Sequence, residues 1–221
     1  MSNFLFFGLV FTIYSFIGWT IEVINSFIGT KKFVNRGFLI GPVCPIYGYG
    51  SIFMILLLSK YENDLLIVFV MSMFIAGVLE YITSFVMEKI FKARWWDYSN
   101  KRFNINGRIC LETLFMFGLG GIIIISFFNP ILVTFLNTIP ILILNVISIV
   151  VLFIYLIDNI ISYNIILNFK QVTSTVKKDS TEEITKMVKS VLEKKSFFTK
   201  RLVNAFPNFN SIFKKYDIRK K

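Results

Sequence analysis

Seven polar side chains stand in or beside apolar stretches in which a charge is costly. They are Glu22, Arg36, Glu80, Ser84, Glu88, Arg108 and Glu112. An ionised group at the centre of a bilayer costs about 3 kcal/mol or more unless it is paired, hydrated or protonated. Such residues indicate a substrate path or binding site, and we take the seven as candidates for lining a substrate chamber. The alternative is a set of structural ion pairs at the membrane interface.

The segment from Leu79 to Leu111 contains two of the four acids named above and the most basic loop. It begins in an apolar run that carries Glu80 and Glu88, crosses an aromatic and basic loop, and enters the next apolar run at Arg108. Glu80 stands about ten residues before the end of its run, which at 1.5 Å per residue is ~15 Å deep. Arg108 and Glu112 are four positions apart, a spacing that predicts an ion pair on one face of a helix.

The composition is typical of a membrane protein. The 221 residues are 55% hydrophobic and include 26 Phe, and several apolar runs reach spanning length. The net charge of +11 is carried by short loops and a tail beside these runs, which favours anionic lipid over nucleic acid as a partner. The chain has no histidine and only two cysteines, Cys44 and Cys110. We therefore expect no Ser-His-Asp triad, no zinc site, no other metal or cofactor, and no catalytic residue.

Five apolar runs predict the membrane-spanning helices, at about residues 4–28, 45–59, 65–90, 108–128 and 131–161. The predicted fold class is an all-α integral membrane protein with about five transmembrane helices plus a basic amphipathic C-terminal helix. Residues 1–161 form the transmembrane domain and 162–221 a basic cytoplasmic tail. In the tail, Ser180 and Glu183 match a capping box. The apolar residues that follow recur at helical spacing, which predicts a helix on the inner leaflet or one that docks a partner.

Proline, glycine and asparagine mark the expected breaks. The second run is short, and it begins with GPVCPIYGYG, from Gly41 to Gly50. Either this stretch completes the crossing in a non-helical form, or it only starts a helix. Asn129-Pro130 predicts a helix break, and the last span can begin near Pro140. The expected capping groups for the fourth span are Asn104, Asn106 and Gly107.

The distribution of Lys and Arg predicts the orientation. Three stand in the loop at 29–40, one at Lys60, six from Lys89 to Arg108, and fourteen after residue 161. With five spans, the positive-inside rule places the N-terminus outside the cell membrane and the C-terminus in the cytoplasm. Every acid named above then lies toward the cytoplasm, and so do both thiols, which stay reduced there. The pattern predicts a charged chamber open to the cytoplasm.

The loop from Phe91 to Gly107 carries two indoles among basic residues. This composition is typical of a segment anchored at the level of the lipid headgroups. A second interpretation is that the loop docks a partner protein, and the candidates for that contact are Arg94, Trp95, Trp96 and Asp97.

Four stretches resemble the CmpB-like family of bacterial membrane proteins, whose members are labelled ABC-transporter permeases of type IV. They are YSFIGWTIE (14–22), NRGFLIGPVCPIYGYG (35–50), LEYITSFVMEKIFKARWWDYS (79–99) and FNINGRICLE (103–112). The resemblance covers about 14–128, and we expect the fifth span and the tail to lie outside it. The residues typical of that family correspond in this sequence to Glu22, Arg36, Gly37, Gly41, Pro42, Pro45, Gly48, Glu80, Glu88, Arg94, Trp95, Trp96, Asp97, Asn106, Gly107 and Arg108.

The resemblance implies a transport subunit powered by a separate ATPase, since the chain has no GxxxxGK[ST] phosphate loop. The loop at 91–107 is then the expected docking site, and with only five spans an oligomer or a partner is needed. Two alternatives remain open. One is a non-catalytic membrane scaffold whose tail recruits lipid or a partner. The other is an enzyme that acts on a lipid headgroup through the clustered acids and arginines.

Overall fold

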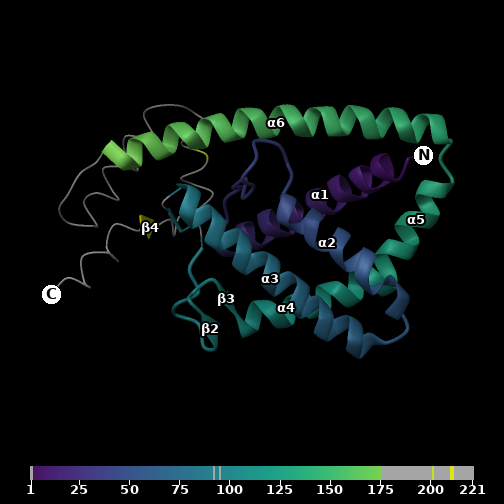
Figure 1. The fold of residues 1–221 in the computed structure, drawn as a ribbon, viewed down its shortest axis with the longest axis horizontal. Coiled ribbons are helices and arrows are strands. Elements are labelled where there is room, and N and C mark those ends of the chain that lie inside the picture. Colours follow the sequence, from purple (N-terminus) through teal and green to yellow (C-terminus); the bar gives the residue numbers. More distant parts are fainter. Residues whose placement is uncertain (1, 92, 95, 176–200, 202–209, 212–221) are drawn as a thin grey trace.

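The computed structural model describes residues 2–91, 93–94, 96–175, 201 and 210–211 (Figure 1). The amphipathic helix expected in the tail lies outside these residues, as does Trp95. The helices and strands, in chain order, are α1 (Asn3–Thr30), α2 (Pro45–Leu58), the 3-10 turn η1 (Ser59–Tyr61), α3 (Leu65–Phe91), β1 (Ala93–Arg94), β2 (Asn104–Ile105), β3 (Ile109–Cys110), α4 (Leu111–Ile122), the π-helical η2 (Ile123–Phe128), α5 (Asn129–Asn137), α6 (Ile141–Thr175) and β4 (Asn210–Ser211).

Four helical stretches are long and apolar enough to cross a membrane, namely Asn3–Thr30, Leu65–Ile90, Leu111–Asn137 and Ile141–Asn164. These spans confirm the predicted all-α membrane fold. The fifth predicted helix is α2, whose 14 residues extend only ~21 Å, less than the ~30 Å of a hydrocarbon core. By helix length alone, the described part of the chain therefore contains four full crossings rather than five.

The expected helix break at Asn129-Pro130 is wrong. The π-helical stretch η2 precedes this dipeptide directly, and α5 continues the same helical run to Asn137. Pro130 stands in the first turn of α5, where it removes no essential hydrogen-bond donor, and the wider π turn before it accommodates its ring. The last span begins at Ile141, directly after Pro140, which agrees with the start expected near Pro140. Its helix, α6, continues to Thr175, well past the expected end at 161.

The helices pack through two apolar clusters and a few small residues. One cluster joins α1 to α5 and α6 through residues such as Val10, Leu136 and Leu144. The other joins α2, α3 and η2 around Leu58 and Val68. Small residues permit the closest approach of α1 and α2, because a Cβ on Gly18 or on Gly48 would overlap a side chain of the partner helix.

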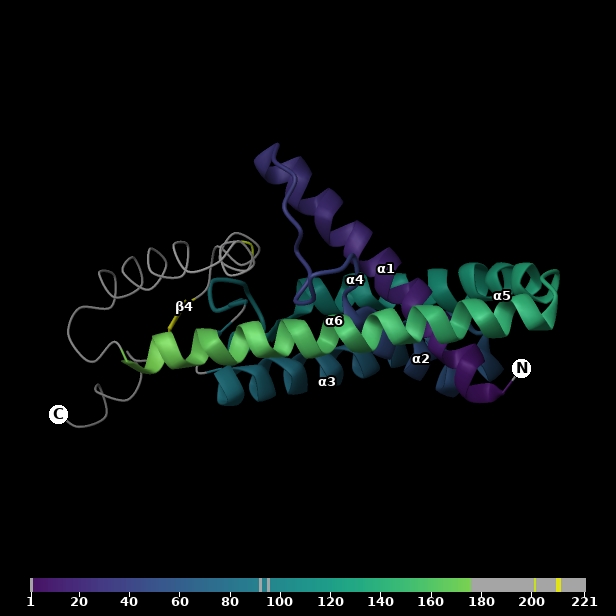
Figure 2. The same ribbon diagram turned by 90° about the horizontal axis from the view of Figure 1, so that it is seen from above.

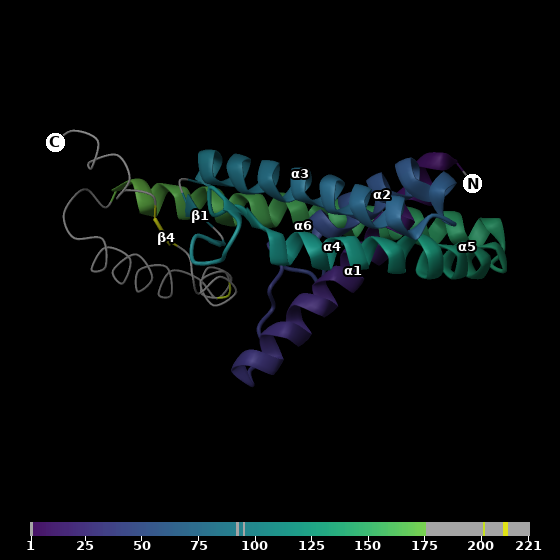
Figure 3. The same ribbon diagram turned by 90° about the horizontal axis from the view of Figure 1, so that it is seen from below.

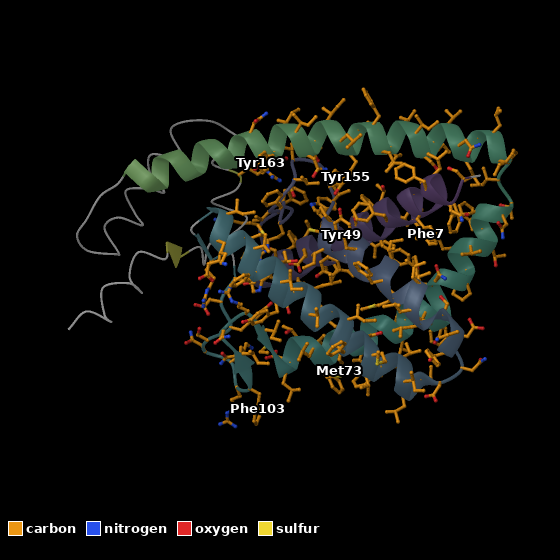
Figure 4. The ribbon with its side chains drawn as sticks, viewed as in Figure 1. Phe7, Tyr49, Met73, Phe103, Tyr155 and Tyr163 are labelled. Carbon is orange, nitrogen blue, oxygen red and sulfur yellow. The ribbon has the colours of Figure 1, made fainter. Side chains whose placement is uncertain are left out.

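The long helix α6 covers one side of the other helices (Figures 1 and 2). It contacts α1, where Phe11 places its ring against Tyr155 of α6 and Tyr49 of α2; both tyrosines are labelled in Figure 4. Most of its other large apolar side chains are exposed, as expected for a helix that faces lipid. Helix α1 crosses obliquely, and its C-terminal part projects away from the remaining helices (Figure 3).

The stretch between α1 and α2 is non-helical and closely bonded to its neighbours. The N–H of Cys44 donates to the carbonyl of Ser15 at 2.9 Å, so α2 begins beside the middle of α1. The N–H groups of Ile40 and Gly41 each donate to one carboxylate oxygen of Asp158 in α6, both at 2.9 Å. Pro45 is thus an ordinary first-turn proline. In the irregular backbone before it, the N–H groups of Ile40, Gly41, Val43 and Cys44 donate to protein acceptors.

Candidate functional site

Glu88, in the last turns of α3, is the centre of an ion network. Its Oε2 lies 3.2 Å from Nε of Arg94 and 2.8 Å from Nη2 of Arg108. Arg94 also pairs with Asp97, with 3.3 Å between Nη1 and Oδ1. One carboxylate therefore holds together the end of α3, the loop that follows it and the residues just before α4.

Arg108 does not pair with Glu112, so that prediction is wrong. Helix α4 begins only at Leu111, and at Arg108 the chain is still in a turn, where the four-residue spacing of a helix does not apply. Arg108 is 8% exposed and reaches back to α3, where its Nη1 donates to Oγ of Ser84 at 3.2 Å. Glu112 points outward and pairs with Lys101 at 2.8 Å. Within the predicted set, Ser84 and Arg108 are thus buried beside the partly buried Glu88, whereas Glu112 is exposed.

A two-stranded hairpin holds Arg108 in this position. Strands β2 and β3 are antiparallel, with Ile105 opposite Ile109. The turn between them places Asn106 and Gly107 at positive φ, 54° and 66°, as the two central residues of a type I′ turn require. These residues therefore form the hairpin turn instead of capping the fourth span. The N-terminal cap of α4 is Cys110, with Thr113 in the capping box.

Gly107 also touches the ion network. A Cβ there would overlap Oγ of Ser99 and lie 2.5 Å from Oδ1 of Asp97. Burial disfavours the charged form of Asp97, but the hydrogen bonds from Ser99 and the charge of Arg94 outweigh it and lower the pKa of Asp97 below its usual range. Asp97 is therefore a carboxylate near neutral pH, and the network of two arginines and two carboxylates is balanced in charge.

A second connection reaches deeper into α3. The hydroxyl of Tyr98 donates to Oε1 of Glu80 at 3.1 Å. Glu80 is 6% exposed, and its other oxygen, Oε2, has no hydrogen-bond partner. Burial raises the pKa of Tyr98, and the charge of Glu80, its hydrogen bond and the charge of Glu22 add to this effect. Glu22 and Glu80, on different helices, thus both act on the same phenol.

Glu22 lies at the contact between α1 and α2. Its Oε1 accepts a hydrogen bond of 2.7 Å from the hydroxyl of Tyr47. Its Oε2 stands 3.9 Å from Nε of Arg36, a distance too long for a hydrogen bond. Both side chains of this pair are about one-third exposed. Glu22 and Glu80 are consequently the two candidates whose charge is least neutralised by a neighbouring cation.

Of the described residues proposed for partner docking, Arg94 and Trp96 are partly buried, whereas Asp97 is exposed. The side chain of Arg94 is 11% exposed and bound to two carboxylates. The indole of Trp96 donates to the carbonyl of Arg108 at 3.0 Å, and Asp97 accepts hydrogen bonds from Ser99. The bonds of these three side chains hold the loop in its path. The outer surface of the loop also includes Asn100, Phe103 and Ile105.

Three participants were not identified from the sequence as parts of the site. Tyr98 and Tyr47 supply the hydroxyls that bind Glu80 and Glu22, and Asp158 holds the segment before α2. Aromatic residues in a loop beside the membrane commonly anchor it at the level of the lipid headgroups. The residue type of Tyr98 therefore did not indicate a bond to Glu80. Among the described residues, no three of His, Cys, Asp and Glu converge as a metal site would require.

The fold and this polar centre define a multi-span α-helical membrane protein. The chain belongs to the CmpB family, described as "Putative ABC-transporter type IV", whose model matches residues 9–163. This match confirms the family that the four sequence stretches resemble. It also includes most of α6, so the expectation that the fifth span lies outside the family's signature is wrong. No curated protein and no solved structure matches the chain.

Proposed function

We propose that this chain is the membrane-spanning subunit of a transporter that is powered by a separate ATPase. The observation that carries the proposal is the attachment of the α3–α4 loop to both helices. Glu88 and the Tyr98–Glu80 hydrogen bond join the loop to α3, and the Lys101–Glu112 pair joins it to α4. An ATPase that moves this loop would move the ends of both helices with it, because ion pairs and hydrogen bonds join all three parts. Family membership supports the same class of function.

The substrate path that we propose passes between Glu22 and Glu80 and opens to the cytoplasm. The balanced network around Glu88 leaves no free charge for a substrate. By contrast, Oε2 of Glu80 has no partner, and Glu22 is paired only loosely. A carboxylate with a free oxygen favours a substrate that donates hydrogen bonds or carries positive charge. Replacement of Glu80 by Gln would accordingly impair transport without loss of expression.

The orientation that we propose has the N-terminus outside the cell and the C-terminus in the cytoplasm. Its support is the charge count, together with the placement of the N-terminus and the far end of α6 at opposite ends of the helices (Figure 1). This orientation needs an odd number of crossings, so α2 and the irregular segment before it together complete a fifth crossing. Five crossings are few for a transport path, so a second copy of the chain completes it. The basic tail contacts anionic lipid of the inner leaflet.

Site-specific photo-cross-linking tests the docking part of this proposal. Ile105 is 54% exposed on β2, and a photoreactive residue there should capture an ATPase in native membranes. The matched control position is Tyr61, which is exposed in the turn before α3, at the opposite end of that helix. Equal capture at the two positions, or no ATPase at Ile105, would contradict docking on the loop.

A non-catalytic membrane scaffold is the second candidate function. The balance of charge among Arg94, Arg108, Glu88 and Asp97 favours it, because such a network stabilises a loop without binding anything further. A scaffold would keep its activity when Glu80 is replaced by Gln, whereas a transport subunit would lose it.

A further inference from the structure

A surface groove of about 810 Å³ lies between the tip of the α3–α4 loop and the first two turns of α4. It is separate from the ion network and from Glu22 and Glu80. Four of its lining residues come from the loop and four from α4: Asn100, Lys101, Arg102, Phe103, Leu111, Glu112, Phe115 and Met116.

The floor of the groove is apolar and descends along a membrane-spanning helix. Leu111, Phe115 and Met116 are 48%, 52% and 62% exposed, respectively. Along α4, Met116 lies ~8 Å beyond Leu111, so the groove continues from the membrane interface into the hydrocarbon layer. Exposed side chains of this type at this depth suit an acyl chain rather than water.

The rim of the groove carries a strained aromatic residue. Phe103 has a φ of 52° and is 78% exposed, and it points away from the body of helices (Figure 4). A bulky residue rarely adopts the left-handed region, because its Cβ then crowds the backbone. The loop therefore holds an apolar ring outward beside the groove, where it is favourable only against lipid or another apolar surface.

The mouth of the groove has one uncompensated positive charge. Lys101 is neutralised by Glu112 through the exposed ion pair. Arg102 is exposed and has no ion pair with any described residue. A guanidinium binds a phosphate through two parallel hydrogen bonds, so the mouth is suited to a headgroup with a net negative charge.

From this combination we propose that the groove binds an anionic phospholipid of the bilayer. Its phosphate lies against Arg102, and one acyl chain follows Leu111, Phe115 and Met116. Phe103 inserts beside it at the interface. The proposal is independent of the ATPase, since it uses neither the ion network nor Ile105.

The test measures which lipids stay bound to the purified protein. The full chain is equilibrated in mixed micelles that contain equal amounts of phosphatidylglycerol and phosphatidylcholine, and the retained lipids are counted by native mass spectrometry. Replacement of Arg102 by Gln should lower retained phosphatidylglycerol about fivefold, the factor expected for one basic residue at an anionic surface. Lys60→Gln removes an equally exposed charge from the distant turn and should change nothing.

Glu112→Gln should change the amount of retained phosphatidylglycerol in the opposite direction. It frees Lys101 from its ion pair, so phosphatidylglycerol retention should rise above that of the wild type. Phe103→Ser should reduce the retention of both lipids. Equal retention in the Arg102→Gln and Lys60→Gln variants would overturn the proposal. So would the loss of a co-purifying protein, instead of lipid, from the Arg102→Gln variant, because a protein partner would then occupy the groove.

Discussion

The hydroxyl oxygen of Tyr98 lies 3.1 Å from Oε1 of Glu80 and donates a hydrogen bond to it. Tyr98 belongs to the loop after α3, whereas Glu80 lies inside that helix. Oε2 of Glu80 has no partner, so this hydrogen bond is the carboxyl group's only described one. Together with the pairs of Glu88, it makes the loop and the membrane helix a single structural unit.

Tyr98→Phe should destabilise the protein by about 1–3 kcal/mol, because it leaves both oxygens of a buried carboxyl group without a partner. Thermal unfolding in detergent, followed by tryptophan fluorescence, measures the change. Tyr61→Phe is the control, since Tyr61 lies exposed in a turn. Equal melting temperatures for the two variants would show that the bond to Glu80 contributes nothing.

Glu88→Gln should be more damaging than any change to the exposed pair. Its side chain is 17% exposed and serves two arginines that are 11% and 9% exposed. Loss of the charge leaves Arg94 and Arg108 insufficiently paired, which costs about 3 kcal/mol for a buried pair. Glu112→Gln removes one charge from a pair whose side chains are 53% and 66% exposed, and it should cost much less because water screens that pair. Denaturation of both variants in the same detergent compares them, and similar losses would argue against the network.

Gly107→Ala should disrupt the hairpin turn. The position has a φ of 66°, and an added Cβ would overlap Ser99 and crowd Asp97, so the loss should exceed 1 kcal/mol. Gly120→Ala is the matched control, because a Cβ on this α4 residue meets nothing within 4 Å. That variant should be neutral or more stable by up to ~1 kcal/mol. The melting temperature should fall for Gly107→Ala and should stay the same or rise for Gly120→Ala. A Gly107→Ala variant as stable as the wild type would contradict the hairpin.

Asp158→Asn should loosen the segment between α1 and α2. Ile40 and Gly41 donate to separate oxygens of this carboxylate, and an asparagine retains only one acceptor. Trypsin should then cleave faster after Lys31, Lys32 and Arg36, as fragment mass spectrometry in micelles would show. Asn159→Ala, on the same helix, removes a bond to the carbonyl of Tyr155 but none to Ile40 or Gly41, and it should leave the cleavage rate unchanged. Identical digestion of Asp158→Asn and the wild type would show that Asp158 does not hold the segment.

Hydropathy predicted the long helices well because apolar runs and polar turns alternate clearly along most of this chain. The run at 65–90 corresponds to α3, Leu65–Phe91, and the short second run to α2, Pro45–Leu58. Pro130 was misjudged because a proline normally ends a helix, whereas here the preceding π turn accommodates it. The pattern of residue types contains no signal for such a turn.

The charged residues around Glu80 and Glu88 could be predicted, but neither their partners nor the tyrosines that bond to the acids could. Buried charge in an apolar run identifies Glu80 and Glu88 directly. Pairing depends on the path of the loop, which brings Tyr98 to Glu80 and Arg108 to Glu88 across 18 and 20 positions. The bonds from Ile40 and Gly41 to Asp158 span 118 and 117 positions. Helical spacing rules address neighbours three or four positions apart, so they assigned Arg108 to Glu112 instead.

The central claim is that this membrane protein works with a separate ATPase that docks on the α3–α4 loop. The most direct measurement is purification of the full chain from native membranes in mild detergent, with mass spectrometry of the proteins that accompany it in stoichiometric amount. The account predicts one ATPase with the wild type and with Tyr61→Asp, and its loss from Ile105→Asp, which places a charge on the exposed face of β2. A chain that purifies without an ATPase at its native level of expression would contradict the account.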